Sequence, residues 1–358
     1  MRYLHCTMIF LIRNSHFDLY YLYSNTTKYK KESVYDKRNV LKKYIEEHYP
    51  KKNVLILEEH FVFGKREGYL SYDDIFLKNL NDIETLSAAF ANGIIIIHDS
   101  ISTGAELAAF ASNEMLKDKM CVLEPDSTGI EERKISAFLE LAFFSTDSKI
   151  RRIVYYPEVY SFEISEKHVE KRTNFVNNTI TPILGDKICS FIDYCKLELD
   201  IRFEKMKFGK INNSVGVISY SKNGNELQVY VSGQVILYQV MGLLSINDIR
   251  KQLRKKKRLY EHIDFVCGQY KNILHHTIQE KLKSETNTIW VSVKEINVEL
   301  RDVIAYSLYM LQALELISIL KEKELYKIGL KNNLGIFLSE LDDIVSEADN
   351  EILEFLNE

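Results

Sequence analysis

The sequence predicts an α/β protein, in which a doubly wound, Rossmann-like parallel sheet is followed by a mainly helical C-terminal half that ends in a winged helix. Three observations lead to this prediction. Short apolar strands alternate with helices up to about residue 150. Four consecutive isoleucines, Ile94–Ile97, are followed by a small polar loop and a helix. Residues 293–341 have the order of a winged helix, with a short helix, a long helix and a hairpin.

The elements before the isoleucine run are defined by apolar runs and by the residues that end them. Met8–Ile12 is predicted to be the first buried strand. Apolar residues recur at helical spacing in Ser33–His48, and Pro50 ends this helix. Val54–Leu57 is predicted to be a second buried strand, and Tyr72–Asn92 a helix that leads into the third.

Ile94–Ile97 and the helix after it enclose the central loop of this part of the chain. A short run of β-branched residues is typical of a strand that is buried on both faces of a parallel sheet. Ala105–Lys117 is rich in strong helix formers, and the small hydroxyl residues before it can cap its start. Lys119–Leu123 is predicted to be a fourth strand, and Ile135–Phe144 a closing helix.

Beyond about residue 155 the sequence is predicted to be mainly helical. The elements expected there are a mostly helical stretch at Glu163–Glu204, a hairpin of Ser214–Ser221 with Glu226–Ser232, a long helical region at Ile246–Leu282, helices at Lys294–Leu300 and Asp302–Leu320, and a wing hairpin at Lys321–Gly329 that is followed by Leu330–Leu341. The Asn223-Gly224 pair is a strong hairpin signal. We therefore expect an α/β domain at 1–150, a connecting region with the hairpin at 151–285, a winged helix at 286–345 and an acidic tail at 346–358.

Composition limits the class of protein and its surroundings. The 358 residues carry a formal net charge of −4, so overall charge does not favour nucleic acid and any such contact needs a local basic patch. The five cysteines are scattered without metal-ligand spacing, which is typical of free thiols in a reducing compartment. No apolar run is long enough to span a bilayer. We expect a soluble, cytoplasmic protein with no membrane contact and no metal site.

The loop after the isoleucine run carries a resemblance to a known family. The segment Asp99–Phe110, DSISTGAELAAF, resembles the nucleophile segment of the nucleoside 2-deoxyribosyltransferase-like superfamily. The longer pattern, through Asn113-Glu114 and Lys119–Val122, is similar to the effector of type II retrons, which joins such a domain to a C-terminal winged helix. This resemblance implies a bacterial anti-phage toxin that is restrained by a retron reverse transcriptase and its multicopy single-stranded DNA (msDNA). It also implies an oligomeric assembly.

The resemblance assigns roles to individual residues. Glu106 is implied to be the nucleophile, or the carboxylate that stabilises an oxocarbenium-like sugar. The implied contacts to ribose hydroxyls or phosphate are Asp99, Ser100, Ser102, Thr103 and Gly104. Glu59 and Glu84 are candidates for a second acid. The alternative for Glu106 and Glu84 is a solvated helical carboxylate without a catalytic role.

Two basic features have both a functional and a structural interpretation. Arg13 and Asn14 follow the first predicted strand, where Arg13 either binds a substrate phosphate or pairs with a neighbouring acidic residue. The run at Arg250–Arg258 is either a solvated helix face or a nucleic-acid contact. The basic residues of this run are Arg250, Lys251, Arg254, Lys255, Lys256, Lys257 and Arg258.

Three functions are consistent with these features. The first is an N-glycosidase toxin whose substrate is a nucleotide, most readily NAD, because nicotinamide is already a cationic leaving group. This activity needs no bound cofactor. The second is a nucleoside deoxyribosyltransferase of salvage metabolism, which the extra C-terminal half argues against. The third is a non-catalytic nucleotide sensor that regulates transcription. The predicted helix at Asp302–Leu320 lacks a face of Arg, Asn or Gln side chains that could read bases, which favours protein docking or shape-level contact with nucleic acid.

Overall fold

The computed structural model describes two compact units. Its described residues are 19–23, 36–50, 53–56, 59, 61, 70, 75, 80–98, 107–108, 110–111, 116, 119–126, 153–165, 168–197, 213–215, 218–223, 226–231, 233–245, 247–282, 288–293, 296–322 and 325–330. The parallel-sheet unit comprises Phe17–His60 and Ala91–Asp200. The helical unit comprises Met1–His16, Phe61–Phe90 and Ile201–Glu358.

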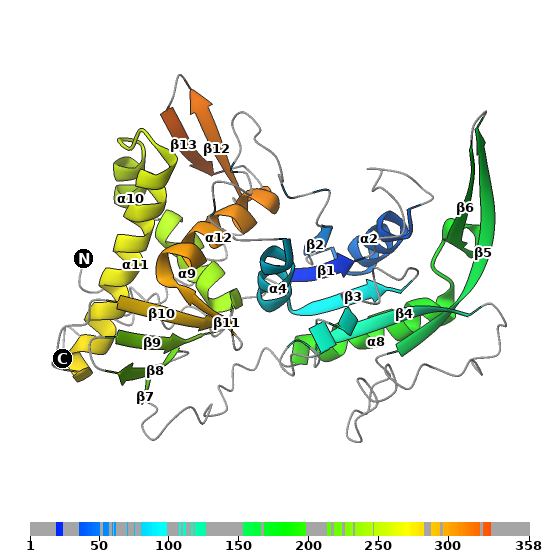
Figure 1. Ribbon diagram of the computed structural model, residues 1–358, viewed down its shortest axis with the longest axis horizontal. Coiled ribbons are helices and arrows are strands. Elements are labelled where there is room, and N and C mark those ends of the chain that lie inside the picture. Colours follow the sequence, from blue (N-terminus) through cyan, green and yellow to red (C-terminus); the bar gives the residue numbers. More distant parts are fainter. Residues whose placement is uncertain are drawn as a thin grey trace. The chain divides into compact units, whose positions relative to one another are not determined.

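The parallel-sheet unit is built on a six-stranded sheet (Figure 1). Its strands are β1 (Leu19–Tyr23), β2 (Asn53–Ile56), β3 (Gly93–Ile97), β4 (Met120–Asp126), β5 (Ile153–Ser165) and β6 (His168–Phe175). Their order is β2-β1-β3-β4-β5-β6, and every pair is parallel except β5 with β6. The expected α/β architecture with a parallel sheet is therefore confirmed.

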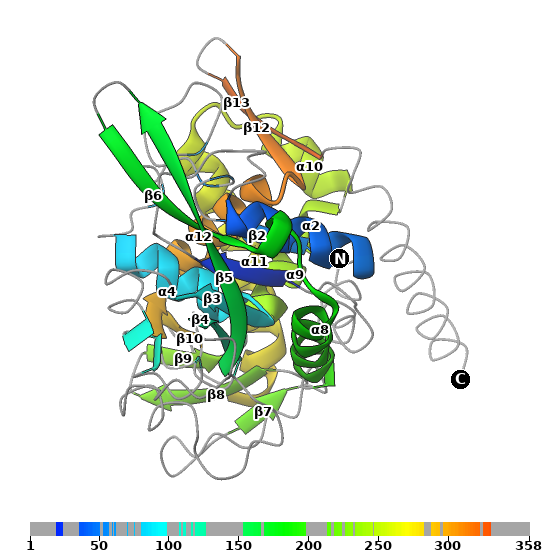
Figure 2. The ribbon, with the colours of Figure 1, turned by 90° about the vertical axis from the view of Figure 1, so that its right-hand side faces the viewer.

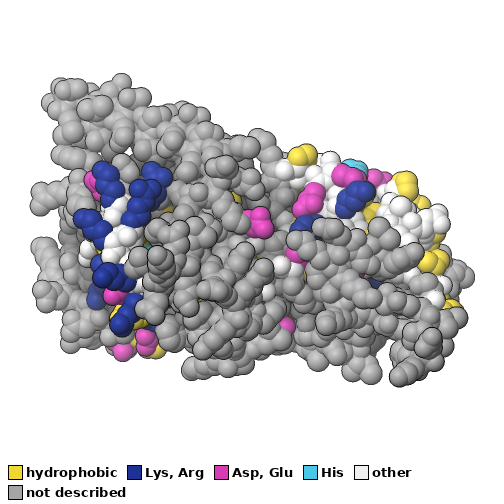
Figure 3. Space-filling view, turned by 90° about the horizontal axis from the view of Figure 1, so that it is seen from above, with side chains coloured by type: hydrophobic (Ala, Val, Ile, Leu, Met, Phe, Trp, Pro, Cys, Tyr) yellow, Lys and Arg dark blue, Asp and Glu magenta, His cyan; other side chains and the backbone are white. Residues whose placement is uncertain are grey.

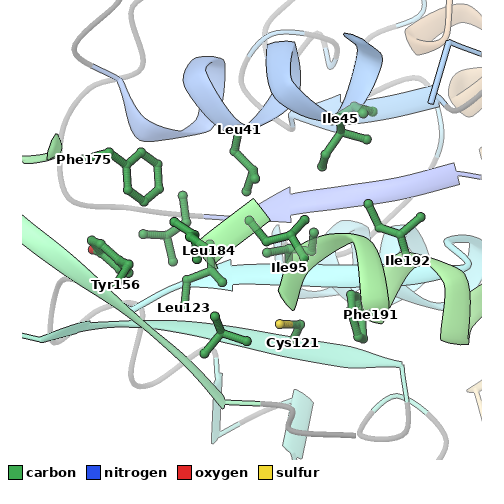
Figure 4. Packing of buried hydrophobic residues seen from close by; sticks show 14 of the residues in the cluster. Leu41, Ile45, Ile95, Cys121, Leu123, Tyr156, Phe175, Leu184, Phe191 and Ile192 are labelled. Atoms are coloured by element: carbon green, nitrogen blue, oxygen red, sulfur yellow. The ribbon is translucent and has the colours of Figure 1, made fainter. Parts of the chain in front are cut away.

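Two helices, α2 (Lys37–His48) and α8 (Pro182–Leu197), pack on the sheet of this unit. Their apolar side chains meet alternate residues of β3, β4 and β5 in one buried cluster (Figure 4). Ile95, Cys121 and Tyr156 are fully buried there. The amide of Arg38 donates to the carboxylate of Asp36 at 2.9 Å, which caps the start of α2. Burial of this face fixes the register of the strands, because a slip by one residue would turn the apolar side chains outward.

The structure adds one strand to the parallel-sheet unit and corrects two expectations there. The strand between β2 and β3 is Leu19–Tyr23, whereas the predicted strand Met8–Ile12 lies outside the described residues. The stretch from Glu163 is not helical at first, because β5 and β6 form a hairpin up to Phe175 and α8 begins only at Pro182. The predicted boundary at residue 150 separates β4 from β5, although these are adjacent strands of one sheet.

Alternation of side chains explains the β5–β6 hairpin. Beyond Pro157, β5 pairs only with β6, and the two strands continue as a ribbon (Figure 2). Tyr160 and Phe162 alternate with Ser161 and Glu163, which is the period of a strand and not that of a helix. A short 3-10 turn, Val176–Asn178, then links the ribbon to α8.

The helical unit contains a second sheet, of five strands. Its elements are α4 (Leu80–Phe90), β7 (Asn213–Val215), β8 (Ile218–Asn223), β9 (Glu226–Tyr230), α9 (Gly233–Ser245), α10 (Asn247–Leu253), α11 (Leu259–Leu282), β10 (Thr288–Val293), β11 (Ile296–Glu299), α12 (Leu300–Ala313), β12 (Ile317–Glu322) and β13 (Leu325–Leu330). The sheet has the order β11-β10-β9-β8-β7, in which only β9 and β10 are parallel. Strands β12 and β13 form a separate hairpin.

The hairpin predicted around Asn223-Gly224 is confirmed as β8 and β9, and it belongs to this larger sheet. The helix predicted at Lys294–Leu300 is wrong, because residues 296–299 form strand β11. The following helix ends at Ala313, before the strand-forming run Ile317–Leu320. The predicted wing is a hairpin, β12–β13, but the segment Leu330–Leu341 and the acidic tail lie outside the described residues, apart from Leu330 in β13.

Helix α12 is the buried centre of the helical unit. All its residues from Val303 to Ala313 are buried. Tyr306 shares a 2.7 Å hydrogen bond with Ser87 of α4, and the side-chain amide of Gln312 pairs with both backbone groups of Leu70 at 2.8 and 2.9 Å. A helix that is buried in this way has no free face to insert into a DNA groove.

Close packing of α4 against α9 gives the first testable prediction. A Cβ at Gly233 would lie 2.7 Å from the ring of Phe90 and 2.9 Å from its Cα. We expect Gly233→Ala to lower the free energy of unfolding by about 1–3 kcal/mol through overpacking. Gly268 within α11 has no neighbour within 4 Å of such a Cβ, so Gly268→Ala should instead raise stability by about 0.5–1 kcal/mol. Urea unfolding of both variants measures the difference, and equal effects would contradict the packing described here.

No helix in the described part of the chain has the length and apolar character needed to cross a bilayer.

Candidate functional site

Strand β3 ends at the segment that the sequence marks as catalytic. Ile94–Ile97 are completely buried, and the chain passes through His98 into the predicted loop. Asp99, Ser100, Ser102, Thr103, Gly104 and Glu106 lie outside the described residues. Directly after them, Leu107 and Phe110 are helical and buried, as is Leu116 further on. The predicted helix at Ala105–Lys117 is thus confirmed at its described positions.

A histidine and a glutamate meet at the carboxyl ends of β3 and β4. The Nδ1 atom of His98 lies 2.6 Å from Oε2 of Glu124, and the amide of His98 donates to the carbonyl of Leu123 at 2.9 Å. The exposed fractions of the two side chains are 26% for His98 and 14% for Glu124. The imidazole is therefore held by a carboxylate on one side while part of it still reaches solvent.

The alternation of each strand defines the side of the sheet on which this pair lies. Ile97 and Leu123 point into the cluster under α2 and α8. Because successive side chains of a strand point to opposite faces, Glu124 emerges on the other face, and its contact with His98 brings the imidazole to the same side. Sequence analysis missed this pair, since its members are 26 residues apart and belong to no local motif.

The two candidate acids of the sequence lie in different surroundings. Glu59 follows β2 and accepts a 2.7 Å hydrogen bond from Nζ of Lys42 on α2. Strand β1 separates β2 from β3, so Glu59 does not follow the strand next to β3. Glu84 is buried in α4, within the helical unit. A second-acid role for either residue stays a prediction.

Arg13 and Asn14 lie outside the described residues. The strand beside β3 is Leu19–Tyr23, so the chain leaves its carboxyl end through Ser24, Asn25 and Thr26. The phosphate contact predicted for Arg13 stays a prediction.

The start of α2 carries a buried charged cluster that sequence analysis also missed. Arg38 donates from Nε and Nη2 to the two carboxylate oxygens of Asp36, at 3.0 and 2.9 Å. Lys37 donates to the hydroxyl of Tyr156 at 2.9 Å and lies 3.5 Å from the carboxylate of Glu158. Buried charges need such partners, so this cluster fixes α2 against β5.

The predicted basic run forms a turn between two helices. Helix α10 ends at Leu253 and α11 begins at Leu259, so the long helical region expected at Ile246–Leu282 is broken here. We call Arg250–Arg258 the basic elbow. Figure 3 shows Lys and Arg side chains gathered over the region of α10 and α11. Arg254, Lys255 and Lys257 are exposed, and none forms an ion pair with a described residue.

Local contacts fix the shape of the basic elbow. The carboxylate of Glu261 accepts from the amides of Lys257 and Arg258, at 2.7 and 3.0 Å, and these bonds hold the pKa of Glu261 below its usual value. The side chain of His262 is buried next to this turn, with its Nδ1 atom 2.9 Å from the carbonyl oxygen of Arg258. Burial lowers the pKa of this imidazole. Tyr260 is exposed beside the guanidinium of Arg258, which lies 5.9 Å from the ring centroid.

Comparison with known proteins supplies the identity of the chain. Curated proteins give no match. The family model described as the STM3845 retron effector protein matches residues 35–344, a range that includes the His98–Glu124 pair and the basic elbow. The chain belongs to this family of retron effectors.

Proposed function

We propose that this retron effector is an N-glycosidase toxin of antiviral defence, which hydrolyses the bond between a base and its ribose in a nucleotide, most readily NAD. The observation that carries the proposal is the position of the Asp99–Glu106 segment directly after β3. Parallel strands in the order 2-1-3-4-5 are typical of doubly wound folds, which bind ligands outside the carboxyl ends of the strands where the strand order reverses. Here the order reverses between β1 and β3, and the segment follows β3.

The residue types in this segment suit glycosidic cleavage. Glu106 attacks C1′ of the ribose, or stabilises the oxocarbenium-like transition state, as the base departs. Asp99, Ser100, Ser102, Thr103 and Gly104 supply hydroxyl, carboxylate and amide groups for ribose or phosphate. Nicotinamide leaves without protonation because it is cationic in NAD, so a site with a single carboxylate nucleophile suits this substrate. Arg13 and Asn14 remain candidates for a phosphate contact.

The C-terminal part is proposed to dock partners. In our proposal the toxin is restrained in an oligomeric complex with the retron reverse transcriptase and its msDNA. The winged-helix assignment is supported only by α12 followed by the hairpin β12–β13. Because α12 is buried, this part would contact a protein or the shape of a nucleic acid and would not read bases.

The basic elbow is the proposed contact to msDNA. Three of its exposed cations, Arg254, Lys255 and Lys257, form no ion pair with a described residue, and Tyr260 offers an exposed ring nearby. Cations that neutralise phosphates, next to an aromatic ring on which a base stacks, are typical of single-strand binding.

Charge reversal at two of these lysines tests the contact. We expect Lys255→Glu combined with Lys257→Glu to weaken binding of single-stranded DNA at least about tenfold and to reduce the salt slope by about 1.4, since each phosphate contact contributes about 0.7. Titration by fluorescence anisotropy at several salt concentrations measures both quantities. Lys43→Glu, at an exposed lysine of α2, is the control and should change neither. An unchanged slope in the double variant would remove the elbow from the interface.

The nucleotide pool of cells tests the glycosidase proposal and separates it from the alternatives. The effector is expressed without its reverse transcriptase, and nucleotides and free bases are measured by mass spectrometry. A fall in NAD with a matching rise in nicotinamide is the expected result. Exchange of bases among deoxynucleosides would indicate the transferase of salvage metabolism. Growth arrest without any change in the pool would indicate the non-catalytic regulator.

A further inference from the structure

The His98–Glu124 contact determines which imidazole nitrogen carries the proton. A carboxylate only accepts hydrogen bonds, so at 2.6 Å the Nδ1–H group of His98 donates to Oε2 of Glu124. The neutral imidazole then keeps its lone pair at Nε2, and a proton taken up there produces an imidazolium that Glu124 stabilises. This is the arrangement by which a carboxylate orients a histidine base toward its reactant.

The backbone holds this pair at a defined place in the fold. The amide of His98 is bonded to the carbonyl of Leu123, so the end of β3 is fixed to the strand that presents Glu124. The imidazole is partly exposed, which lets water reach it, whereas the carboxylate behind it is nearly buried. His98 is followed immediately by the Asp99–Glu106 segment, at the carboxyl edge where the proposed reaction takes place.

We infer that His98 is the general base that activates water in the hydrolytic half of the reaction, and that Glu124 is its positioning residue. The inference rests on the proposed function. In the first half, the bond from C1′ to the base breaks and C1′ forms an ester with Glu106. In the second half, a water oxygen forms a bond to C1′, the ester bond breaks, and Glu106 leaves as a carboxylate. The water proton passes to Nε2 of His98 and from there to solvent.

This role explains how the site would favour water as the acceptor. A hydrolase must deprotonate water as it attacks, and a positioned base contributes about 10²–10⁴-fold to such a step.

A pre-steady-state burst experiment separates the two halves. Wild type, His98→Asn and Glu124→Gln are mixed with excess NAD, and the nicotinamide released is measured over time alongside the intact mass of the protein. For His98→Asn we expect a burst of about one equivalent of nicotinamide, a mass increase from the sugar adduct, and steady turnover lowered about 10²–10⁴-fold. For Glu124→Gln, whose amide oxygen still accepts from Nδ1–H, we expect a loss of about 10–100-fold.

Azide provides the readout that a purely structural role would not affect. Azide attacks C1′ as an anion and needs no base, so it should restore turnover in His98→Asn and yield the glycosyl azide. Full steady turnover in His98→Asn would overturn the inference, as would loss of the burst in a variant that melts like wild type. Wild type that releases no base, or Glu106→Gln that keeps its burst, would instead refute the proposed function, and the inference would fall with it.

Discussion

Glu106→Gln is expected to lower nucleotide turnover by about 10⁴-fold or more, because glutamine is isosteric with the proposed nucleophile and cannot form the glycosyl ester. The variant should also lose its toxicity in cells that lack the reverse transcriptase. Steady-state release of the base measures the first effect, and growth after induction measures the second.

Glu47→Gln is the matched control for this change, since Glu47 is an exposed carboxylate of α2 that pairs only loosely with Lys43, at 3.8 Å. It should turn over substrate like wild type. Far-UV circular dichroism and thermal melting should be unchanged in both variants. Turnover in Glu106→Gln within about tenfold of wild type, a difference of only about 1.4 kcal/mol in activation free energy, would leave Glu106 as the solvated helix carboxylate of the alternative interpretation.

Arg38→Met is expected to cost about 3–5 kcal/mol of stability, because it leaves the buried carboxylate of Asp36 without its bidentate partner. Methionine keeps an apolar chain at this position, so the loss of stability reflects the missing charge more than the missing volume. Equilibrium unfolding in urea measures the change. The effect should be among the largest of any single substitution in α2, since the guanidinium is almost completely buried.

Lys43→Met on the same helix is the control for this variant. The side chain of Lys43 is 78% exposed, its ammonium nitrogen lies 3.8 Å from the carboxylate of Glu47, and surface pairs of this kind contribute little. We expect a change within about 0.5 kcal/mol. If Arg38→Met changed the free energy of unfolding as little as Lys43→Met, the charged cluster at the start of α2 would not stabilise the protein as we describe.

The sequence predicted elements best where a short-range pattern has one solution. The apolar runs at Val54–Leu57, Ile94–Ile97 and Lys119–Leu123 correspond to β2, β3 and β4, and the amphipathic pattern before Pro50 corresponds to α2. Each of these segments is bounded by polar residues or by proline, so local propensity and burial agree.

The errors arose where long-range pairing decides between similar segments. Leu19–Tyr23 was not predicted to be a strand, and its pairing with β2 and β3 identifies it as one. Residues 296–299 were predicted to be part of a helix. They form strand β11 because β10 is available as an antiparallel partner.

The candidate site was predictable only where its residues belong to one local segment. The Asp99–Glu106 segment is local and was found through its resemblance to a family. His98 and Glu124 come together only when β3 and β4 pair, so no local pattern indicated their contact. The break of the long helix at the basic elbow depends likewise on Glu261 and on the burial of His262.

The release of nicotinamide from NAD by the purified protein tests the central claim most directly. The protein is assayed alone and after addition of its reverse transcriptase with msDNA, and Glu106→Gln is assayed in parallel. The account predicts steady release by the free effector, suppression in the complex, and none in the variant. Release that persists in Glu106→Gln would contradict the assignment of the nucleophile. No release from NAD or any other nucleotide by the folded free effector would contradict the glycosidase itself.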